Sequence, residues 1–244
     1  DLVVTWMTDL GLTVTVDAVG NVVASTSSAG ATGAVMAGSH IDTVGTGGRF
    51  DGNLGVLAGL EVIEATLAAD IELNRPLAVA FFSNEEGSRY PPDMMGSLAY
   101  VGGMSVESVL EIEGADGTVV GDELERIGYR GAAPCPGAVP HAFVELHIEQ
   151  GPILEDESID IGVVTHGQGL NWLQVTLTGK EAHTGSTPMP KRVNAGLGMA
   201  RITQLVDEIA WSHAPLAVGA VGHCDVYPNS RNIIPGKVVF TIDF

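Results

Sequence analysis

The segments "GAVMAGSH" (33–40) and "PLAVAFFSN" (76–84) are two short and almost continuously apolar runs. Runs of this length and character are typical of strands that are buried on both faces of a sheet. A third run, "HAFVELHIE" (141–149), also reads as a strand. The three runs together predict a sheet with layers on both sides.

The segment "NLGVLAGLEVIEATLAA" (53–69), between the first two runs, has the period of an amphipathic helix. Val56, Leu60, Ile63 and Leu67 recur at spacings of four, three and four residues. A strand, a helix and a second strand in this order predict an α/β fold, in which helices cover a mixed sheet. Weaker helical patterns occur at 94–101 and 120–128.

The pattern changes near residues 155–165, where β-branched residues and strict alternation become frequent. The remainder predicts two β-segments, one long helix and two more strands, which is a β-β-α-β-β order. We therefore expect a larger domain over 1–161 and a smaller one over 162–244. The segments behind this second prediction are 161–179, 190–211, 216–226 and 236–244.

The composition excludes several classes of protein. The formal net charge is −19 with only 11 lysines and arginines, which repels nucleic acid and anionic membranes. No apolar stretch approaches the roughly 18 residues that span a bilayer. Two cysteines, Cys135 and Cys224, form no disulfide framework and favour a reducing, cytoplasmic location. The acidity is typical of adaptation to high salt and, equally, of acidic proteins from GC-rich genomes.

Titratable residues gather at the predicted strand ends. His40 ends the first strand, Glu85 and Glu86 follow the second, His147 lies near the end of the third, and Asp51 precedes the helix. In an open α/β sheet, ligands bind outside the carboxyl ends of the strands. Several acids in one place repel each other unless a cation neutralises them. Mixed His, Asp and Glu ligands suit Zn²⁺, Mn²⁺, Co²⁺ or Ni²⁺, which favours a metal site over an ordinary polar rim.

The adjacent carboxylates of Glu85 and Glu86 have a chemical interpretation. Neighbouring residues on a strand or tight turn point to different sides, so one can ligate a metal while the other faces the substrate. A carboxylate beside the cation can serve as general base for an attacking water.

The sequence resembles one family of amidohydrolases, which contains N-carbamoyl-L-amino acid hydrolases, allantoate amidohydrolases and β-ureidopropionases. These are members of a larger superfamily of aminoacylases and peptidases that use two metals. The resemblance covers nearly the whole chain in family order. The matching blocks are "DAVGN" (17–21), "GSHIDTV" (38–44), "GGRFDGNLGVLAG" (47–59), "SNEEGSRYPPDMMGS" (83–97), "ELHIEQGP" (145–152), "GQGLNW" (167–172), "AHTGSTPM" (182–189) and "RNIIPG" (231–236).

The resemblance implies a site for two divalent metal ions in the larger, catalytic domain. His40 and His147 would ligate one metal, Glu86 would ligate the other, and Asp51 would bridge both. Glu85 would be the general base that takes a proton from a water bound to the metal.

Further roles follow from the same blocks. Asp42 would hold the His40 imidazole in its ligating tautomer, and His183 would stabilise the oxyanion at the scissile carbonyl. Asn232 would bind substrate, and Gln150 and Gln168 are candidates for substrate contact or for support of the site. The smaller domain would serve as a lid and would form a homodimer through its edge strands.

Two family features have no counterpart in this sequence. The family supplies a fifth metal ligand, a histidine, and a carboxylate-binding arginine from later segments. His213 and His223 lie inside the second predicted domain and do not suit the histidine role. The chain starts without Met and ends within the apparent strand "VVFTIDF", so we expect a fragment. Because it lacks the fifth ligand and the arginine, we expect this fragment to bind the second metal poorly and not to turn over.

The implied reaction is hydrolysis of the linear C–N bond of an N-carbamoyl (ureido) compound. For an N-carbamoyl-L-amino acid the products would be the amino acid, CO₂ and ammonia. The main alternative is an allantoate amidohydrolase of ureide breakdown. Less favoured alternatives are a dipeptidase or aminoacylase of the superfamily and a metal-binding relative without catalysis. The intact "NEEG" (84–87) argues against the last of these.

Overall fold

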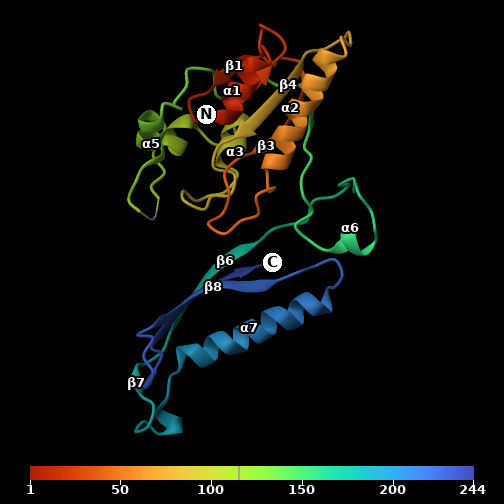
Figure 1. Cartoon of the computed structure of the whole chain (residues 1–244). Helices are drawn as coiled ribbons and strands as arrows, with labels where there is room; N and C mark the ends of the chain where they lie inside the picture. Colours follow the sequence, from red (N-terminus) through yellow and green to blue (C-terminus); the bar gives the residue numbers. More distant parts are fainter. Residues whose placement is uncertain (115) are drawn as a thin grey trace. The chain divides into compact units, whose positions relative to one another are not determined.

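The protein is described by a computed structural model that covers residues 1–114 and 116–244. Two compact units make up the chain, Asp1–Asp160 and Ile161–Phe244 (Figure 1). The sheets and apolar core clusters of one unit are separate from those of the other. The catalytic and lid roles of the two predicted domains stay predictions.

The first unit contains a five-stranded mixed sheet in the order β1-β2-β4-β3-β5. The β1–β2 and β2–β4 pairs are antiparallel, whereas β3 is parallel to both β4 and β5. The sheet therefore presents the carboxyl ends of β3, β4 and β5 at one edge. The strands are β1 (Thr13–Val16), β2 (Val22–Ser25), β3 (Val35–His40), β4 (Leu77–Phe82) and β5 (Ala142–Val144).

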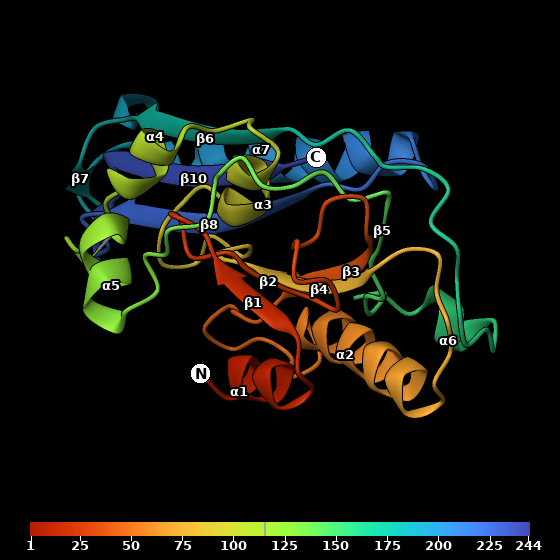
Figure 2. The same ribbon diagram turned by 90° about the horizontal axis from the view of Figure 1, so that it is seen from above.

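Helices cover both faces of this sheet, as the apolar strands predicted. In β4, Val79 and Phe81 join the core beneath α1 (Leu2–Asp9) and α2 (Asn53–Ala68), while Ala78 and Ala80 face the opposite core. Figure 2 shows α1 and α2 together on one side of the sheet and α3 (Met95–Tyr100) on the other. A further core joins α3 to α4 (Val106–Leu110) and α5 (Val120–Ile127).

Three details of the first unit differ from the sequence-based expectations. Leu67 is 48% exposed because it lies in the last turn of α2, beyond the core that buries Val56, Leu60 and Ile63. The predicted strand 141–149 is paired only as β5, and its side chains are exposed at the sheet edge. The N-terminal helix and the β1–β2 hairpin were not predicted.

The second unit is a three-stranded antiparallel sheet packed against one long helix. Strands β6 (Trp172–Thr178), β10 (Lys237–Asp243) and β8 (Ala220–Tyr227) lie in that order. Alternate residues of β10, namely Val238, Phe240 and Ile242, are buried against α7 (Ala195–Ser212). The expected first β-segment is wrong for 161–171, which form no strand.

Several short elements, among them a two-stranded ladder in the second unit, accompany these sheets and helices. The ladder pairs β7 (Ala182–His183) with β9 (Ile233–Ile234) in antiparallel register. Other short elements are α6 (Ile153–Asp156) and a 3₁₀ turn over Met189–Lys191, together with a bridge between Lys180 and Val193. Among the helices of the described residues, none has the length and hydropathy that a membrane span requires.

Candidate metal centre

The predicted metal ligands come from three neighbouring strands and the start of one helix. The register of the parallel pair sets His40, the last residue of β3, opposite Phe82, the last residue of β4. The chain therefore leaves both strands at the same edge, where β4 continues into Glu85 and Glu86. The segment after β5 brings His147 to this edge as well, because its neighbour Leu146 lies at the start of α2.

A glycine lets the start of α2 approach the end of β3. Gly52 adopts a φ of +67°, and a Cβ there would lie 2.5 Å from the ring atoms of His40. No other residue combines this left-handed backbone with so small a volume. Asp51, directly before it, is 8% exposed and is held beside the imidazoles.

Both predicted imidazole ligands have their Nδ1 atoms fixed by backbone carbonyls. His40 Nδ1 lies 3.0 Å from the Asp42 carbonyl oxygen, and His147 Nδ1 lies 2.9 Å from that of Ile148. A carbonyl oxygen only accepts, so each Nδ1 carries a hydrogen and, in the neutral ring, Nε2 presents its lone pair. This is the orientation in which histidine ligates a metal through Nε2.

The remaining ligand atoms lie close to these Nε2 atoms. Asp51 Oδ1 is 3.3 Å from His147 Nε2, and Glu85 Oε2 is 3.5 Å from His40 Nε2. The ring centroids of the two histidines are 6.0 Å apart. Two groups have ligand atoms within 4.8 Å of one another, and both contain His40. They are His40 with Asp51 and His147, and His40 with Glu85 and Glu86.

Asp42 supports this arrangement in two ways. Its carboxylate accepts the backbone N–H groups of Glu85 at 3.2 Å and Glu86 at 3.1 Å. One of the same oxygens lies 3.5 Å from His40 Nδ1. One acid therefore ties the end of β3 to the turn that carries both glutamates.

The electrostatics of the edge are strongly perturbed. Burial alone would lower the pKa of His40, but the hydrogen bond to Asp42 and the charge of Glu85 outweigh it and raise that pKa to about 9. Burial raises the pKa of Glu85, and the charges of Glu86, Asp42 and Glu145 add to this, against the opposing effect of His40. Burial also disfavours the ionised Asp42, but its hydrogen bonds to His40 and to the two amides leave the pKa of Asp42 lowered.

The residues fit a divalent cation. Among the described residues, two buried side-chain oxygens have no hydrogen-bond partner, Asp51 Oδ1 and Glu86 Oε1, and both lie in this cluster. Buried polar atoms without partners are costly and rare, and a cation would satisfy both. The donors are imidazole nitrogens and carboxylate oxygens, which suit zinc and the neighbouring transition metals.

Gln150 contacts the predicted bridging acid. Its Nε2 donates to Asp51 Oδ2 at 2.6 Å, and its backbone holds a φ of +57°, which is uncommon for a residue other than glycine. Gln150 thus supports the orientation of Asp51. Because Oδ2 is occupied in this way, the bridging role of Asp51 stays a prediction.

Two contributors were missed by sequence reasoning. Ser39, one residue before His40, donates to Glu145 at 2.5 Å and so links β3 to the segment that carries His147. Asn21 hydrogen-bonds to Ser83 beneath the glutamates. Asn21 lies in the "DAVGN" block, whose sequence pattern indicates no particular role for it.

The predicted substrate residues of the second unit form two groups. His183 Nδ1 accepts the N–H groups of Gly185 and Ser186 at 3.0 and 3.3 Å, so in the neutral ring Nε2 carries the hydrogen and can donate. The Asn232 carbonyl accepts from Thr184, next to His183, at 2.8 Å. Gln168 lies apart from this pair within the unit and donates to the Leu216 carbonyl at 3.1 Å.

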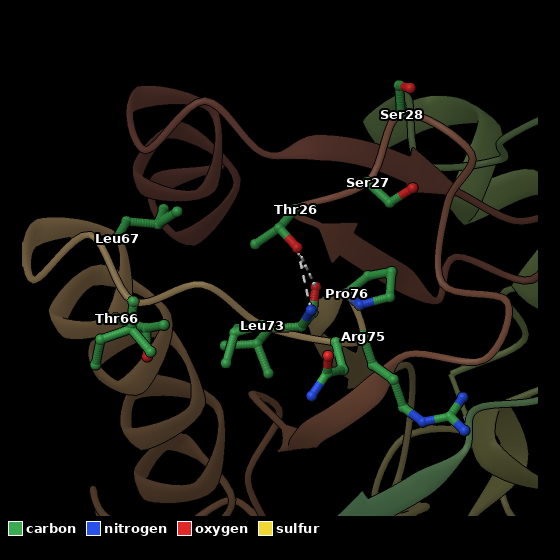
Figure 3. A pocket seen from close by; sticks show the side chains of 11 residues that line it. Thr26, Ser27, Ser28, Thr66, Leu67, Leu73, Arg75 and Pro76 are labelled. Atoms are coloured by element: carbon green, nitrogen blue, oxygen red, sulfur yellow. Dashed lines mark hydrogen bonds between the residues drawn. The ribbon is translucent and has the colours of Figure 1, made fainter.

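A separate cleft of about 540 Å³ lies where β4 begins and β2 ends, beside the last turn of α2. Figure 3 shows Thr26, Ser27, Thr66, Arg75 and Pro76 around it. Arg75 is the one charged residue among those that line it. The cleft therefore lacks the acids and imidazoles that define the candidate centre.

This chain belongs to Peptidase family M20/M25/M40, whose profile matches residues 36–238. It is 52% identical to the N-carbamoyl-L-amino-acid amidohydrolase of Rhizobium meliloti, over 86% of this chain and 50% of that protein. It is 34% identical to the allantoate deiminase of Arabidopsis thaliana, over 98% of this chain and 50% of that protein. The family predicted from the motif blocks is thus confirmed.

Solved structures give the same result for the fold. A hydantoinase/carbamoylase family amidase from Burkholderia vietnamiensis aligns with a TM-score of 0.89 at 50% identity, over all of this chain and 59% of that one. A related amidase from Burkholderia multivorans aligns with a TM-score of 0.85, also at 50% identity, over all of this chain and 60% of that one. The chain spans about half to three fifths of the length of these relatives.

Proposed function

We propose that the protein that carries this sequence hydrolyses N-carbamoyl-L-amino acids to the amino acid, CO₂ and ammonia. The observation that carries the proposal is the cluster at the sheet edge, in which two imidazoles and the unpartnered Asp51 and Glu86 oxygens converge. The identity of 52% to an N-carbamoyl-L-amino-acid amidohydrolase supports the choice of substrate.

We assign the metal ligands as His40, Asp51, Glu86 and His147, with Asp51 between two divalent ions. Zinc, manganese, cobalt and nickel all suit these donors. Bound there, such ions supply Lewis-acid polarisation of a carbonyl and make water a stronger acid. The fixed Nδ1–H of each histidine supports this assignment, because it leaves Nε2 free to ligate.

Glu85 is assigned as the general base and acid. It would accept a proton from the attacking water and then donate that proton to the departing nitrogen. Its pKa is raised by burial and by its acidic neighbours, which brings a carboxyl group nearer to the pH at which proton transfer in both directions is efficient. The Asp42 hydrogen bonds hold its backbone in place for this exchange.

The second unit would contribute to substrate binding. We assign His183 as an oxyanion donor through Nε2–H, which its two backbone contacts at Nδ1 support. Asn232 would bind substrate, and Gln168 is a weaker candidate because its amide already donates to a carbonyl of its own unit. Dimerisation through this unit and a cytoplasmic location also stay predictions.

The second candidate activity is hydrolysis of allantoate. It is favoured by the identities of 33% and 34% to proteins named as probable allantoate deiminase and allantoate deiminase, which cover nearly the whole chain. Both activities cleave a ureido C–N bond and need the same cluster, so the cluster does not separate them.

A substrate panel tests the proposal. The metal-loaded protein is incubated with N-carbamoyl-L-amino acids, allantoate and dipeptides, and ammonia and free amino acids are measured. We expect ammonia and amino acid in equal amounts from the N-carbamoyl compounds and neither from dipeptides. Faster ammonia release from allantoate would favour the second candidate, and amino acids without ammonia would indicate a peptidase. A protein that binds metal but hydrolyses nothing would refute catalysis.

A further inference from the structure

The first observation concerns a buried amide near the candidate centre. Asn21 is 1% exposed and lies in the turn between β1 and β2. Its Nδ2 donates to Asp17 Oδ2 at 2.8 Å and to the Gly96 carbonyl at 2.9 Å. Its Oδ1 accepts the N–H of Ser83 at 3.0 Å. The side chain therefore joins three separate parts of the chain.

The turn that holds Asn21 is itself rigidly built. Asp17 Oδ1 accepts the N–H groups of Val19 and Asn21 at 3.0 and 2.9 Å, so its carboxylate closes the turn and orients the amide. Asp17 is 4% exposed, and burial raises its pKa against the opposing effect of these bonds. A buried acid and a buried amide in contact are costly unless both are fully paired.

The two other contacts of Asn21 are the two ends of one segment. We call Ser83–Gly96 the glutamate loop, because it contains Glu85 and Glu86. Its base is closed by the Gly96 N–H, which donates to the Ser83 carbonyl at 2.9 Å. A Cβ at Gly96 would lie 2.3 Å from Asn21 Oδ1, so only glycine allows α3 to begin this close to the amide.

Contacts inside the glutamate loop transmit the position of its base to the carboxylates. The Met94 N–H donates to the Glu85 carbonyl at 2.6 Å, and Asn84 Nδ2 donates to the Tyr90 carbonyl at 2.7 Å. Asn84 and Met94 both have φ angles near +50°, a backbone region that is strained outside glycine. Such a loop keeps its form only while its surroundings fix it.

We propose that Asn21, oriented by Asp17, is a positioning residue that fixes both ends of the glutamate loop and thereby sets the places of the Glu85 and Glu86 carboxylates. Its catalytic consequence depends on the function proposed above, whereas its effect on the loop does not. Asn21 touches no reacting atom and acts from beneath. Displacement of a catalytic group by about 1 Å can cost about a hundredfold in rate.

Hydrogen exchange measured by mass spectrometry on the 244-residue chain tests the positioning directly. The variant Asn21→Asp removes the donor to Gly96 while keeping the size of the side chain. Ser25→Ala is the matched control, because Ser25 is equally buried in β2 and its hydroxyl, within the described part of the chain, hydrogen-bonds only to Gly30, Ser27 and Leu77. We expect exchange in 83–96 to accelerate about tenfold in the first variant and to stay unchanged in the control.

A double variant separates positioning from folding of the turn. In Asp17→Asn with Asn21→Asp, the amide introduced at position 17 donates to the acid introduced at position 21, so the turn keeps its internal bond. The Gly96 carbonyl still lacks its donor. We expect the melting temperature to recover toward that of the original chain while exchange in 83–96 remains fast. Restored protection of 83–96 in the double variant would overturn the proposal.

Measurements of kcat and KM in the protein that carries this sequence test whether the position of the glutamate loop affects catalysis. We expect Asn21→Asp and the double variant to lower kcat about tenfold to a hundredfold, with KM changed far less, because ground-state binding does not use Asn21. Ser25→Ala should keep the original kcat. If no variant hydrolyses any ureido compound, the proposed function fails, and the exchange result still decides the positioning role. Fast exchange in 83–96 with kcat unchanged would overturn the link to catalysis.

Discussion

The two ends of the parallel strands β3 and β4 are built from the same sheet and differ in their polar chemistry. At the carboxyl ends, imidazoles and acids converge, and Asp51 and Glu86 each have a buried oxygen with no hydrogen-bond partner among the residues that the structure describes. At the amino ends, Thr26 Oγ1 accepts the Leu77 N–H at 3.1 Å, and Arg75 reaches the Gly33 carbonyl at 3.5 Å. Figure 3 shows this second end as an open cleft.

The difference supports the proposal that the carboxyl end is the functional end. Both ends carry polar side chains, so polarity alone does not distinguish them. A buried charge without a partner lowers the stability of the fold, so it is uncommon except where function requires it. The carboxyl end carries that cost, and the amino end carries ordinary hydrogen bonds that close the strands.

The largest expected effect distinguishes the roles of Glu85 and Asp51, two of the acids at the carboxyl end. Glu85→Gln should lower the hydrolysis rate by about 10²–10⁴-fold while the metal content stays unchanged, because this residue moves a proton and does not ligate. Asp51→Ala should lower both. The metal content and the hydrolysis rate are measured in both variants. Equal loss of metal in the two would contradict the assigned roles.

Metal binding should stabilise the carboxyl end specifically. A divalent ion at about 100 times its dissociation constant should add about 2.7 kcal/mol to the free energy of unfolding, because only the folded chain holds the site. His147→Ala should remove most of this gain, which thermal unfolding with and without Zn²⁺ or Mn²⁺ measures. The control His213→Ala, at an exposed histidine of the second unit, should keep the full gain. If both variants lost the stabilisation by metal to a similar extent, the metal would not bind specifically at His147.

Asp42 should matter for metal affinity without being a ligand. Asp42→Ala frees the backbone of Glu85 and Glu86 and removes a carboxylate from beside the imidazole of His40. Loss of such a supporting acid weakens metal affinity by about 10–100-fold. Isothermal titration measures this, with Asp9→Ala, at an exposed position of α1, as control. An unchanged affinity would show that the glutamate loop keeps its conformation without the hydrogen bonds from Asp42.

The acids around His40 should make the free energy of unfolding depend on pH in the chain from which a chelator has removed any metal. The folded pKa of His40 is about 9 against an ordinary value of 6.5, so folding binds a proton. This stabilisation is fully present below pH 6.5 and is lost as the pH rises to 9. Denaturant unfolding across this range should show the decline, and NMR of the ring should show a lower pKa in Glu85→Gln. An unmoved ring titration would contradict the coupling.

The smallest effect is expected at the amino end. Thr26→Val leaves the Leu77 N–H without its acceptor and should cost about 1 kcal/mol of unfolding free energy or less. Metal affinity and hydrolysis should not change, because the cleft shares no residue with the cluster. Calorimetric unfolding and metal titration together measure this. A change in metal affinity would show that the amino end is coupled to the metal cluster, contrary to the comparison above.

Much of the centre could be predicted from the sequence, since strand period and position in the chain place polar residues at strand ends. His40, Glu85 and Glu86 were placed at the carboxyl ends because apolar runs stop there. The hairpin that carries Asn21 was not predicted, because each of its strands is only four residues long and so short a run gives little periodicity to read. The contact of Gln150 with Asp51 joins residues 99 positions apart, and no local pattern reports it.

The sequence by itself determined the class of fold, the family and the residue types available to a metal, because periodicity and motif order are written along the chain. Only the tertiary structure decided which atoms meet. The fixed Nδ1 atoms, the unpartnered oxygens of Asp51 and Glu86, and the clamp of Asn21 on Ser83 and Gly96 depend on contacts between distant segments. Such contacts arise when strands pair and helices pack, and their geometry follows from the register of the whole sheet.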